Sequence, residues 1–215
     1  METRDPGFFS EKFHENRSNR RQGGSFHAFE SSHRRFLLFT VLRFVSHCAG
    51  MNHVGIGYDV HQLVAGRKLF LGGVELAHSK GLDGHSDADV LMHAICDAVL
   101  GALGESDIGH FFPNTDKRWK NVRSHVFLEE AARQVKFREG RIVNVDATLI
   151  AQAPKIAPHV RHMRENIAGA LGISIARVGI KATTNELLGF VGREEGIAAM
   201  AVASVELPEP SDQPI

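Results

Sequence analysis

The stretch Ser86-Asp-Ala-Asp-Val-Leu-Met-His-Ala-Ile-Cys-Asp-Ala-Val-Leu-Gly-Ala-Leu-Gly104 predicts a long helix, and this helix decides how the segments on either side of it can pack. Ser86 is a favourable N-cap, Asp87 and Asp89 in the first turn suit the positive helix end, and Gly104 supplies a stop. Apolar side chains recur at helical spacing at Val90, Leu91, Ala94, Ile95, Ala98, Val99 and Leu103. This pattern predicts an amphipathic helix.

The flanking segments predict strands and two further helices. Residues 53–63 alternate around small residues and predict a strand, and residues 68–71 and 74–76, separated by two glycines, predict a hairpin. Downstream we expect helices at 124–136 and 158–171 and strands at 142–151, 178–182 and 197–207. Because strands and helices alternate without a strict βαβ rhythm, we expect an α+β fold: a two-layer sandwich with a mixed four- to five-stranded sheet and helices on one face.

Length and composition limit the classes of function. A chain of 215 residues with 43% hydrophobic residues accommodates one ordinary domain, which we place at residues 51–207. The formal net charge is zero and the part after residue 50 is mildly acidic, so we expect no nucleic-acid partner. Cys48 and Cys96 have neither metal-site nor redox spacing, which favours a reducing compartment. The apolar run 36–45 is too short to span a membrane, and we expect no membrane partner.

The two ends of the chain are expected to be disordered. Residues 1–35 are rich in Arg, Ser, Gly, Asn and His and show no apolar periodicity, and residues 208–215 are rich in Pro and polar residues. We interpret residues 1–50 as an extension upstream of a natural start at Met51, which the mature protein does not need. A targeting segment, suggested by the basic flank of the apolar run, and a partner-binding arm are the alternatives.

A candidate metal site lies in Gly55-Ile-Gly-Tyr-Asp-Val-His61. Side chains at i and i+2 of a strand point to the same face, so Asp59 and His61 project together. The preceding glycines allow a close approach of another segment. A carboxylate oxygen and an imidazole nitrogen on one face are two thirds of a zinc-type site. The alternative is a surface Asp and His at a strand end.

The predicted helix at 86–104 carries a further histidine. His93 has Asp89 and Asp97 at i−4 and i+4, and one of these carboxylates is expected to fix its tautomer. Alternatively, His93 is a satisfied core histidine beside Met92 and Ala94. The pair His85-Ser86 is expected at the N-terminus of this helix, where free N–H groups favour a phosphate.

Two other segments combine polar and turn residues. Residues 107–116 carry carboxylates and aromatic side chains suited to binding hydroxyl groups, or form a solvated turn. Residues 181–186 end a predicted strand, and Glu186 is a candidate ligand for a hard cation such as Mg²⁺. No P-loop sequence is present, so a diphosphate would be held by metals and helix ends.

Five segments, taken in order, resemble the 2-C-methyl-D-erythritol 2,4-cyclodiphosphate synthase family. They are D-V-H at 59–61, H-S-D-A-D-V-L-M-H at 85–93, D-I-G-H-F-F-P-N-T-D at 107–116, A-Q-A-P-K at 151–155 and K-A-T-T-N-E-L-L-G-F-V-G-R-E-E-G at 181–196. The resemblance covers essentially all of residues 53–206. It implies a homotrimeric enzyme of the non-mevalonate isoprenoid pathway with active sites between subunits. Such an enzyme converts 4-diphosphocytidyl-2-C-methyl-D-erythritol 2-phosphate, a CDP-linked small molecule, to the cyclic diphosphate and releases CMP.

The resemblance also implies roles for individual residues. Asp59, His61 and His93 match zinc ligands, and Glu186 matches the ligand of an Mg²⁺ or Mn²⁺ ion that bridges the substrate diphosphate. His85 and Ser86 match residues that contact phosphate, and Thr184 matches one that helps to polarise it, so His85 and Thr184 are the implied catalytic residues. Residues 151–157 and 183–184 match the cytidine pocket, residues 107, 109 and 112–116 the methylerythritol pocket, and residues 190, 193 and 195 a turn near the trimer axis. The implied substrate contacts are Val60, Ser86, Asp107, Ile108, Gly109, Phe112, Pro113, Asn114, Thr115, Asp116, Ala151, Gln152, Ala153, Pro154, Lys155, Ile156, Ala157, Thr183, Asn185, Phe190 and Arg193.

Two departures and three rival functions accompany this prediction. Asn114 and Asn185 stand where acidic or hydroxyl residues are common in the family, which affects the expected contact of Asn114 with substrate. The rivals are another zinc-dependent nucleotide phosphohydrolase, a non-catalytic trimer that binds an isoprenoid diphosphate, and a nucleic-acid binder that uses the basic N-terminal arm. A cytidine-dependent substrate places the enzyme in the cytoplasm, or in a plastid if the source is eukaryotic.

Overall fold

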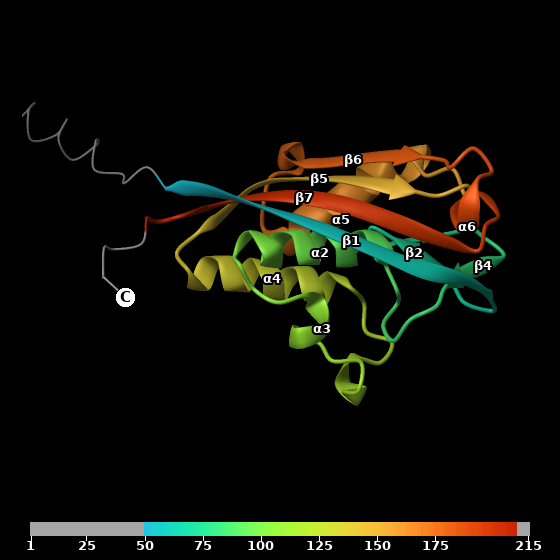
Figure 1. The fold of residues 1–215 in the computed structure, drawn as a ribbon, viewed down its shortest axis with the longest axis horizontal. Helices are drawn as coiled ribbons and strands as arrows, with labels where there is room; N and C mark the ends of the chain where they lie inside the picture. The colour runs from blue at the N-terminus through green and yellow to red at the C-terminus, as the bar shows by residue number, and fades with distance from the viewer. Residues whose placement is uncertain (1–49, 210–215) are drawn as a thin grey trace, which may run out of the picture. The chain divides into compact units, whose positions relative to one another are not determined.

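The computed structural model describes residues 50–209, which form a five-stranded sheet with helices packed on it (Figure 1). The strand order is β4-β1-β7-β5-β6, and every neighbouring pair is antiparallel except β5 and β6. The predicted α+β fold with a mixed sheet is therefore confirmed, with five strands. The predictions for residues 1–49 and for the end of the tail at 210–215 lie outside the described residues.

The elements follow one another in this order along the chain. The strands are β1 (Met51–Ala65), β2 (Leu69–Leu71), β3 (Val74–Leu76), β4 (Lys80–Leu82), β5 (Arg141–Ile150), β6 (Val178–Thr183) and β7 (Gly196–Leu207). The helices are α2 (Val90–Ala102), α3 (Ile108–Phe111), α4 (His125–Phe137), α5 (Val160–Leu171) and α6 (Gly189–Gly192), with 3-10 turns at Lys117–Trp119, Ala157–His159 and Ile175–Arg177. Strands β2 and β3 form a separate hairpin, as predicted.

Two glycines of β1 let α2 lie directly on the sheet. A Cβ atom built on Gly57 would lie 2.0 Å from the carbonyl oxygen of Ala94, and one built on Gly55 would lie 2.1 Å from that of Ala98. Real Cβ atoms do not approach so closely, so this contact between strand and helix backbones requires glycine. Ala94 follows His93 on α2. The close approach therefore brings His93 opposite the part of β1 that follows Gly57.

The sheet has one covered and one bare face. Gly55 and Gly57 of β1 are buried beneath α2, and the alternating positions of β5 and β7 on this face join the hydrophobic core. The side chains between them point the other way. Large apolar side chains exposed on this bare face are Val54, Ile56, Tyr58 and Val60 of β1 and Met200 and Val202 of β7. Val54 is 67% exposed and Ile56 66% exposed, which is unusual for strand residues of this kind.

The start of α2 differs from the prediction. The helix begins at Val90 with Asp89 as its N-cap, so Ser86 does not open it and His85 lies in the loop before it. The buried Asp89 carboxylate accepts from the backbone N–H groups of Gly72 and Gly73 as well as from Met92 of the first helical turn. The β2–β3 turn thus selects Asp89 as the cap. The end of the helix is as predicted, since Gly104 follows its C-cap in a left-handed conformation.

The other helix boundaries lie close to the predictions. Helix α4 follows Ser124 and ends one residue later than expected, and α5 begins at Val160 because residues 157–159 form a 3-10 turn. The short elements β4, α3 and α6 were not predicted, since three or four residues carry too little periodicity. Within residues 50–209, no helix is long and apolar enough to cross a membrane.

Candidate metal centre

Three potential ligand atoms from β1 and α2 converge on one point. Asp59 Oδ2 lies 3.0 Å from His61 Nε2 and 3.0 Å from His93 Nδ1, and the two ring nitrogens are 3.1 Å apart. Across the described part of the chain, this is the one group of three or more His, Cys, Asp or Glu residues with ligand atoms that close together. The structure therefore brings together the three residues that the sequence predicted as a metal site.

The backbone orients these side chains. Asp59 and His61 lie on the helix-covered side of β1, as the i, i+2 spacing predicted, and the N–H of Val60 donates to Asp59 Oδ1 at 2.8 Å. His61 Nδ1 lies 2.6 Å from the carbonyl oxygen of Asp83, which can only accept a hydrogen bond. This contact assigns the hydrogen to Nδ1 and leaves Nε2 of a neutral His61 facing the cluster with its lone pair.

The cluster perturbs the acid–base properties of its members. Burial by itself would raise the pKa of Asp59, but its contacts with the His61 and His93 rings outweigh burial and hold the pKa well below its usual range. Burial by itself would lower the pKa of His61, but the hydrogen bond to Asp59 outweighs it and raises the pKa above the usual 6.5. An ionised carboxylate thus draws positive charge towards the point where the ligand atoms meet.

A divalent metal fits this set of donors. One carboxylate oxygen and two imidazole nitrogens are a zinc-type donor set, and three protein ligands leave a fourth position for an external group. Two nitrogen lone pairs and a carboxylate repel one another at about 3 Å unless a cation or a proton lies between them. Asp59, His61 and His93 are therefore the residues that would hold the ion.

The metal cluster borders a cavity of about 280 Å³. Its lining residues are His61, Gly84, His85, Ser86, His93, Ile108, Phe112, Asn114, Trp119 and Phe127. His85 Nε2 also lies 3.2 Å from the backbone oxygen of Asp116, and the Phe112 ring packs on Phe127 with centroids 4.5 Å apart. Five predicted substrate residues from two separate segments, His85, Ser86, Ile108, Phe112 and Asn114, thus share one cavity with two metal-ligand histidines.

Sequence reasoning missed two aromatic residues of this cavity, Trp119 and Phe127. The Trp119 Nε1 atom is buried and has no hydrogen-bond partner among the described residues. Phe127 lies on α4, and its ring is 5.6 Å from that of His93. The only early signal was that Trp119 is the single tryptophan of the chain and closely follows the 107–116 segment.

The prediction that the carboxylate of Asp89 or Asp97 fixes the tautomer of His93 is wrong. The Asp89 carboxylate binds backbone amides of the β2–β3 turn and α2, and Asp97 accepts from the N–H of Ile108 at 2.8 Å. His93 Nε2 instead lies 2.9 Å from Ser124 Oγ. Helical spacing predicted the neighbours of His93 along α2, but its second ring nitrogen faces the start of α4.

The remaining residues of the 107–116 segment lie outside the lining of the cavity. The carboxylate of Asp107 caps α3 through the N–H of His110, and that of Asp116 caps the following 3-10 turn and pairs with Arg118. The lining does not include Gly109, Pro113 and Thr115 either. Contacts of these five residues with a substrate stay predictions.

A second group of predicted residues gathers at the ends of the parallel strands β5 and β6. The N–H of Ala151 donates to the carbonyl of Thr183 at 3.0 Å, and Gln152 Oε1 accepts from the N–H of Leu187 at 3.3 Å. Thr184 Oγ1 donates to Glu186 Oε1 at 2.8 Å. These contacts bring residues 151–152 together with residues 183–187.

The structure separates this second group from the metal cluster. In the sheet order, β7 and β5 lie between β1 and β6. Three strand spacings of about 4.8 Å amount to about 14 Å. Phe190 and Arg193 lie on and just after α6, where Arg193 pairs with Glu195, and Val60 points to the bare face of the sheet. Glu186 is thus not a ligand of the Asp59–His61–His93 cluster within one chain.

Comparison with known proteins shows which family and which relatives the chain resembles. A model of the YgbB family matches residues 52–206. The 2-C-methyl-D-erythritol 2,4-cyclodiphosphate synthase of Syntrophotalea carbinolica is 59% identical over 152 residues, which cover 71% of this chain and 93% of that protein. The bifunctional enzyme IspD/IspF of Sphingopyxis alaskensis is 56% identical over 156 residues, which cover 73% of this chain but only 40% of that protein.

A solved structure shows the same fold. The Plasmodium falciparum IspF in complex with CDP superposes with a TM-score of 0.65 at 33% identity, over 75% of this chain and 99% of that one. The region that the family model matches, residues 52–206, includes the metal cluster and the whole five-stranded sheet except the ends of β1 and β7. The chain belongs to the YgbB family.

Proposed function

We propose that the chain is a 2-C-methyl-D-erythritol 2,4-cyclodiphosphate synthase, which converts 4-diphosphocytidyl-2-C-methyl-D-erythritol 2-phosphate to the 2,4-cyclodiphosphate and CMP. The observation that carries this proposal is the convergence of Asp59, His61 and His93 at the edge of the cavity that also contains His85 and Ser86. Relatives of the chain that carry this enzyme name are 54–59% identical to it. The enzyme is thus a lyase that closes a ring within its substrate.

The residues divide the work between two half-sites. At the first, Asp59, His61 and His93 would hold zinc, and the ion would supply positive charge for binding and orienting a phosphate oxygen. His85 and Ser86 contact the phosphates, and Ile108, Phe112 and Asn114 contact the methylerythritol group in the same cavity. Residues Asp107, Gly109, Pro113, Thr115 and Asp116 complete this pocket.

The second half-site is the β5–β6 end. Residues 151–157 and 183–185 form the cytidine pocket, and the structure of a relative with bound CDP supports a nucleotide ligand. Glu186 would hold Mg²⁺ or Mn²⁺, and this ion would supply charge neutralisation for the diphosphate. Thr184, whose hydroxyl touches the Glu186 carboxylate, polarises the phosphate that is attacked.

The two half-sites meet between neighbouring subunits of a homotrimer. Two observations support this: about 14 Å of sheet separates them within one chain, and the opposite sheet face presents exposed apolar side chains. Phe190 and Arg193 then lie at the turn near the trimer axis. Neither nucleic acid nor a membrane is a partner, and the cytoplasm, or a plastid in a eukaryote, is the site of action.

The reaction needs positioning more than acid–base chemistry. A 2-phosphate oxygen attacks the β-phosphorus of the CDP group, the bond from this phosphorus to the α-phosphate oxygen breaks, and CMP leaves with the electron pair. No protein nucleophile is required. Because the chain grips both ends of one substrate, the attack is effectively intramolecular. This role accounts for a cavity whose proposed contacts are to phosphate and hydroxyl groups.

One experiment tests the proposal against its rivals. The full chain is incubated with the CDP substrate, with and without a chelator, and phosphorus NMR follows CMP and the cyclic product. A synthase gives both products in a metal-dependent reaction, whereas a phosphohydrolase gives a linear product. Release of linear product alone, or no cyclic product when metals are present, would reject the proposal.

A further inference from the structure

We propose that Asp87 and Ser124 act as a positioning pair that selects the ring tautomer of His93 in which Nδ1 is free to bind the metal. This inference rests on the metal site proposed above and goes beyond it, because neither residue is a metal ligand or lines the path of the substrate phosphate. Ser124 immediately precedes α4, and Asp87 lies in the loop before α2.

The contacts form an unbroken series from the metal cluster. His93 directs Nδ1 at Asp59 and His61, and directs Nε2 at Ser124 Oγ, 2.9 Å away. Ser124 Oγ in turn lies 2.5 Å from Asp87 Oδ1, and the backbone N–H of Ser124 lies 3.1 Å from Asp87 Oδ2. Ser124 is fully buried and His93 is 8% exposed, so little water competes for the contact between these two side chains.

Counting hydrogens assigns the direction of each bond. An ionised carboxylate only accepts, so the one hydroxyl hydrogen of Ser124 is donated to Asp87. Ser124 Oγ is then an acceptor towards His93, and Nε2 must carry the hydrogen. A neutral imidazole has one N–H, which leaves the lone pair on Nδ1, the atom that faces the metal position.

A nearby alternative partner is weaker. Ser86 Oγ lies 3.3 Å from His93 Nε2 and 3.5 Å from Ser124 Oγ, and it accepts the backbone N–H of Ala88. Its longer distance makes it a secondary acceptor for the same hydrogen. Ser86 is therefore compatible with the same tautomer. Among the described residues no carboxylate accepts from its hydroxyl, so Ser86 does not by itself fix the direction of its hydrogen bond with His93.

Ser124 also departs from its expected local role. A serine at a helix N-cap normally accepts a hydrogen bond from the first turn of the helix. The structure shows no capping bond from its side chain, whose hydroxyl is directed at His93 and Asp87 instead. A local preference that is given up in this way is typical of a functional position.

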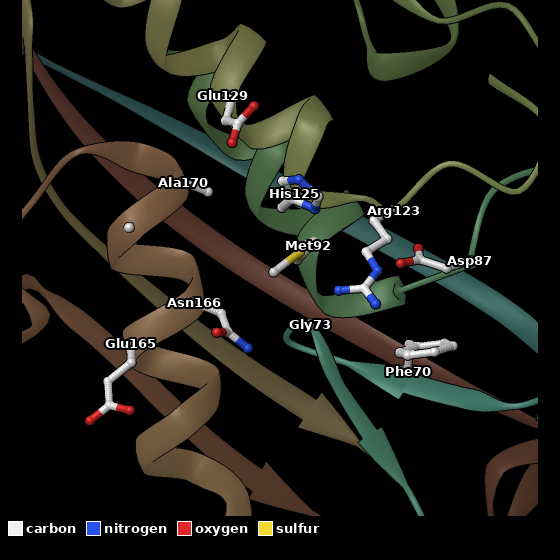
Figure 2. Close-up of a pocket in the computed structure, with 11 residues that line it drawn as sticks. Phe70, Gly73, Asp87, Met92, Arg123, His125, Glu129, Glu165, Asn166 and Ala170 are labelled. Carbon is white, nitrogen blue, oxygen red and sulfur yellow. The ribbon is translucent and has the colours of Figure 1, made fainter. Parts of the chain in front are cut away.

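Asp87 also lies at a second cavity, away from the metal cluster's own cavity. The carboxylate borders a second cavity of about 350 Å³ between α4, α5 and the β2–β3 hairpin. Figure 2 shows Asp87 beside Arg123 at one end of this cavity, with Met92 and Gly73 between them and α5. Asp87 is thus held by α4 and the loop before α2 without touching the metal cluster itself.

The test replaces each member of the pair. Ser124→Ala removes the acceptor for Nε2–H, and Asp87→Asn lets an amide donate to Ser124, which frees the hydroxyl to donate to His93 and favours the wrong tautomer. Glu130→Gln is the matched control, because it neutralises a carboxylate of α4 that pairs with Arg133 at the surface. Zinc affinity is measured by competition with a chromophoric chelator, and circular dichroism checks folding.

We expect Ser124→Ala and Asp87→Asn each to weaken zinc binding by about 10- to 100-fold, with Glu130→Gln unchanged. The double variant should bind zinc no more weakly than Ser124→Ala, since both changes act through one path. In zinc-loaded wild-type protein labelled with [15N]histidine, long-range 1H–15N spectra should place the metal on Nδ1 of His93 and the hydrogen on Nε2.

The outcomes separate this inference from the proposed function. Unchanged zinc affinity in folded Ser124→Ala and Asp87→Asn, or a metal bound to Nε2 of His93 in the wild type, would overturn the inference even if the enzyme is an active synthase. A wild type that binds zinc through Nδ1 but makes no cyclic product would overturn the proposed function alone. A wild type that binds no zinc would overturn both.

Discussion

Asp59 and His61 form a pair in which a proton and a metal compete for one position. Burial alone would lower the pKa of His61, but the hydrogen bond to the Asp59 carboxylate outweighs burial and raises this pKa above 6.5. His61 must be neutral to bind a metal, so binding displaces its proton. In the metal-free protein, the stabilisation from protonated His61 is present at low pH and lost as the pH rises through the raised pKa.

This competition predicts a pH-dependent zinc affinity. Below the raised pKa of His61, the zinc dissociation constant should increase by about tenfold per pH unit for the proton displaced. Chelator competition at several pH values measures the slope, and calorimetry in buffers with different ionisation enthalpies counts the protons released. A dissociation constant that is flat across the acidic range would contradict the assignment of His61 as a ligand.

Glu186 should behave as part of a separate cation site. Glu186→Gln is expected to abolish turnover that depends on Mg²⁺ or Mn²⁺ and to leave zinc affinity unchanged, because β7 and β5 separate the two sites within one chain. CMP release across a magnesium titration and zinc competition are the two measurements. The control is Glu129→Gln on the surface of α4. Loss of zinc binding in Glu186→Gln would contradict the two-site arrangement.

At the scale of elements, the metal site depends on how closely α2 lies on β1. A methyl group at residue 57 would lie 2.0 Å from the carbonyl oxygen of Ala94, so Gly57→Ala must push the helix away from the strand. Overpacking of this kind costs about 1–3 kcal/mol of unfolding free energy. Because His93 is the next residue to Ala94, zinc affinity should fall as well.

Urea unfolding and zinc competition check the effect of Gly57→Ala. The control is Gly169→Ala in α5, where an added Cβ meets nothing within 4 Å and the change should stabilise the helix by about 0.5–1 kcal/mol. If Gly57→Ala unfolds at the wild-type urea concentration and binds zinc normally, the glycine contact is not what positions His93.

At the scale of the whole molecule, the bare sheet face is the expected contact surface of the proposed homotrimer. Ile56 is 66% exposed and lies among the apolar side chains of β1 and β7. Ile56→Glu should prevent association, because an unpaired carboxylate would be buried between subunits. Sedimentation velocity is expected to show a trimer for the wild type and a monomer for the variant.

The same variant separates assembly from metal binding. The Asp59–His61–His93 cluster lies on the other side of the sheet and within one chain, so zinc affinity should persist while synthase activity is lost. A control, Phe137→Glu, changes an exposed apolar residue at the end of α4 and should leave a trimer. A fully active Ile56→Glu monomer would contradict active sites built between subunits.

Much of the fold followed from local periodicity. The two-residue repeat of β1 placed Asp59 and His61 on one face, and the helical repeat placed α2 nearly correctly, because each is a property of consecutive residues. The predicted N-cap of α2, Ser86, was wrong by three residues, since the N-cap is Asp89. Ser86 is a good N-cap locally, but the β2–β3 turn supplies two amides to Asp89, and no sequence pattern records this long-range contact.

The sequence by itself determined the mixed α+β fold, the three metal-ligand candidates and the family resemblance, since these depend on residue types at short spacings or in ordered motifs. Only the tertiary structure decided that His93 turns its second nitrogen to Ser124 rather than to Asp89 or Asp97, and that Glu186 lies three strands away from the metal cluster. The physical reason is the same in both cases. Strand order and helix packing bring together residues that are far apart in the chain, such as His93 and Ser124. They also keep apart residues that the sequence motifs had all assigned to metal binding, such as His93 and Glu186.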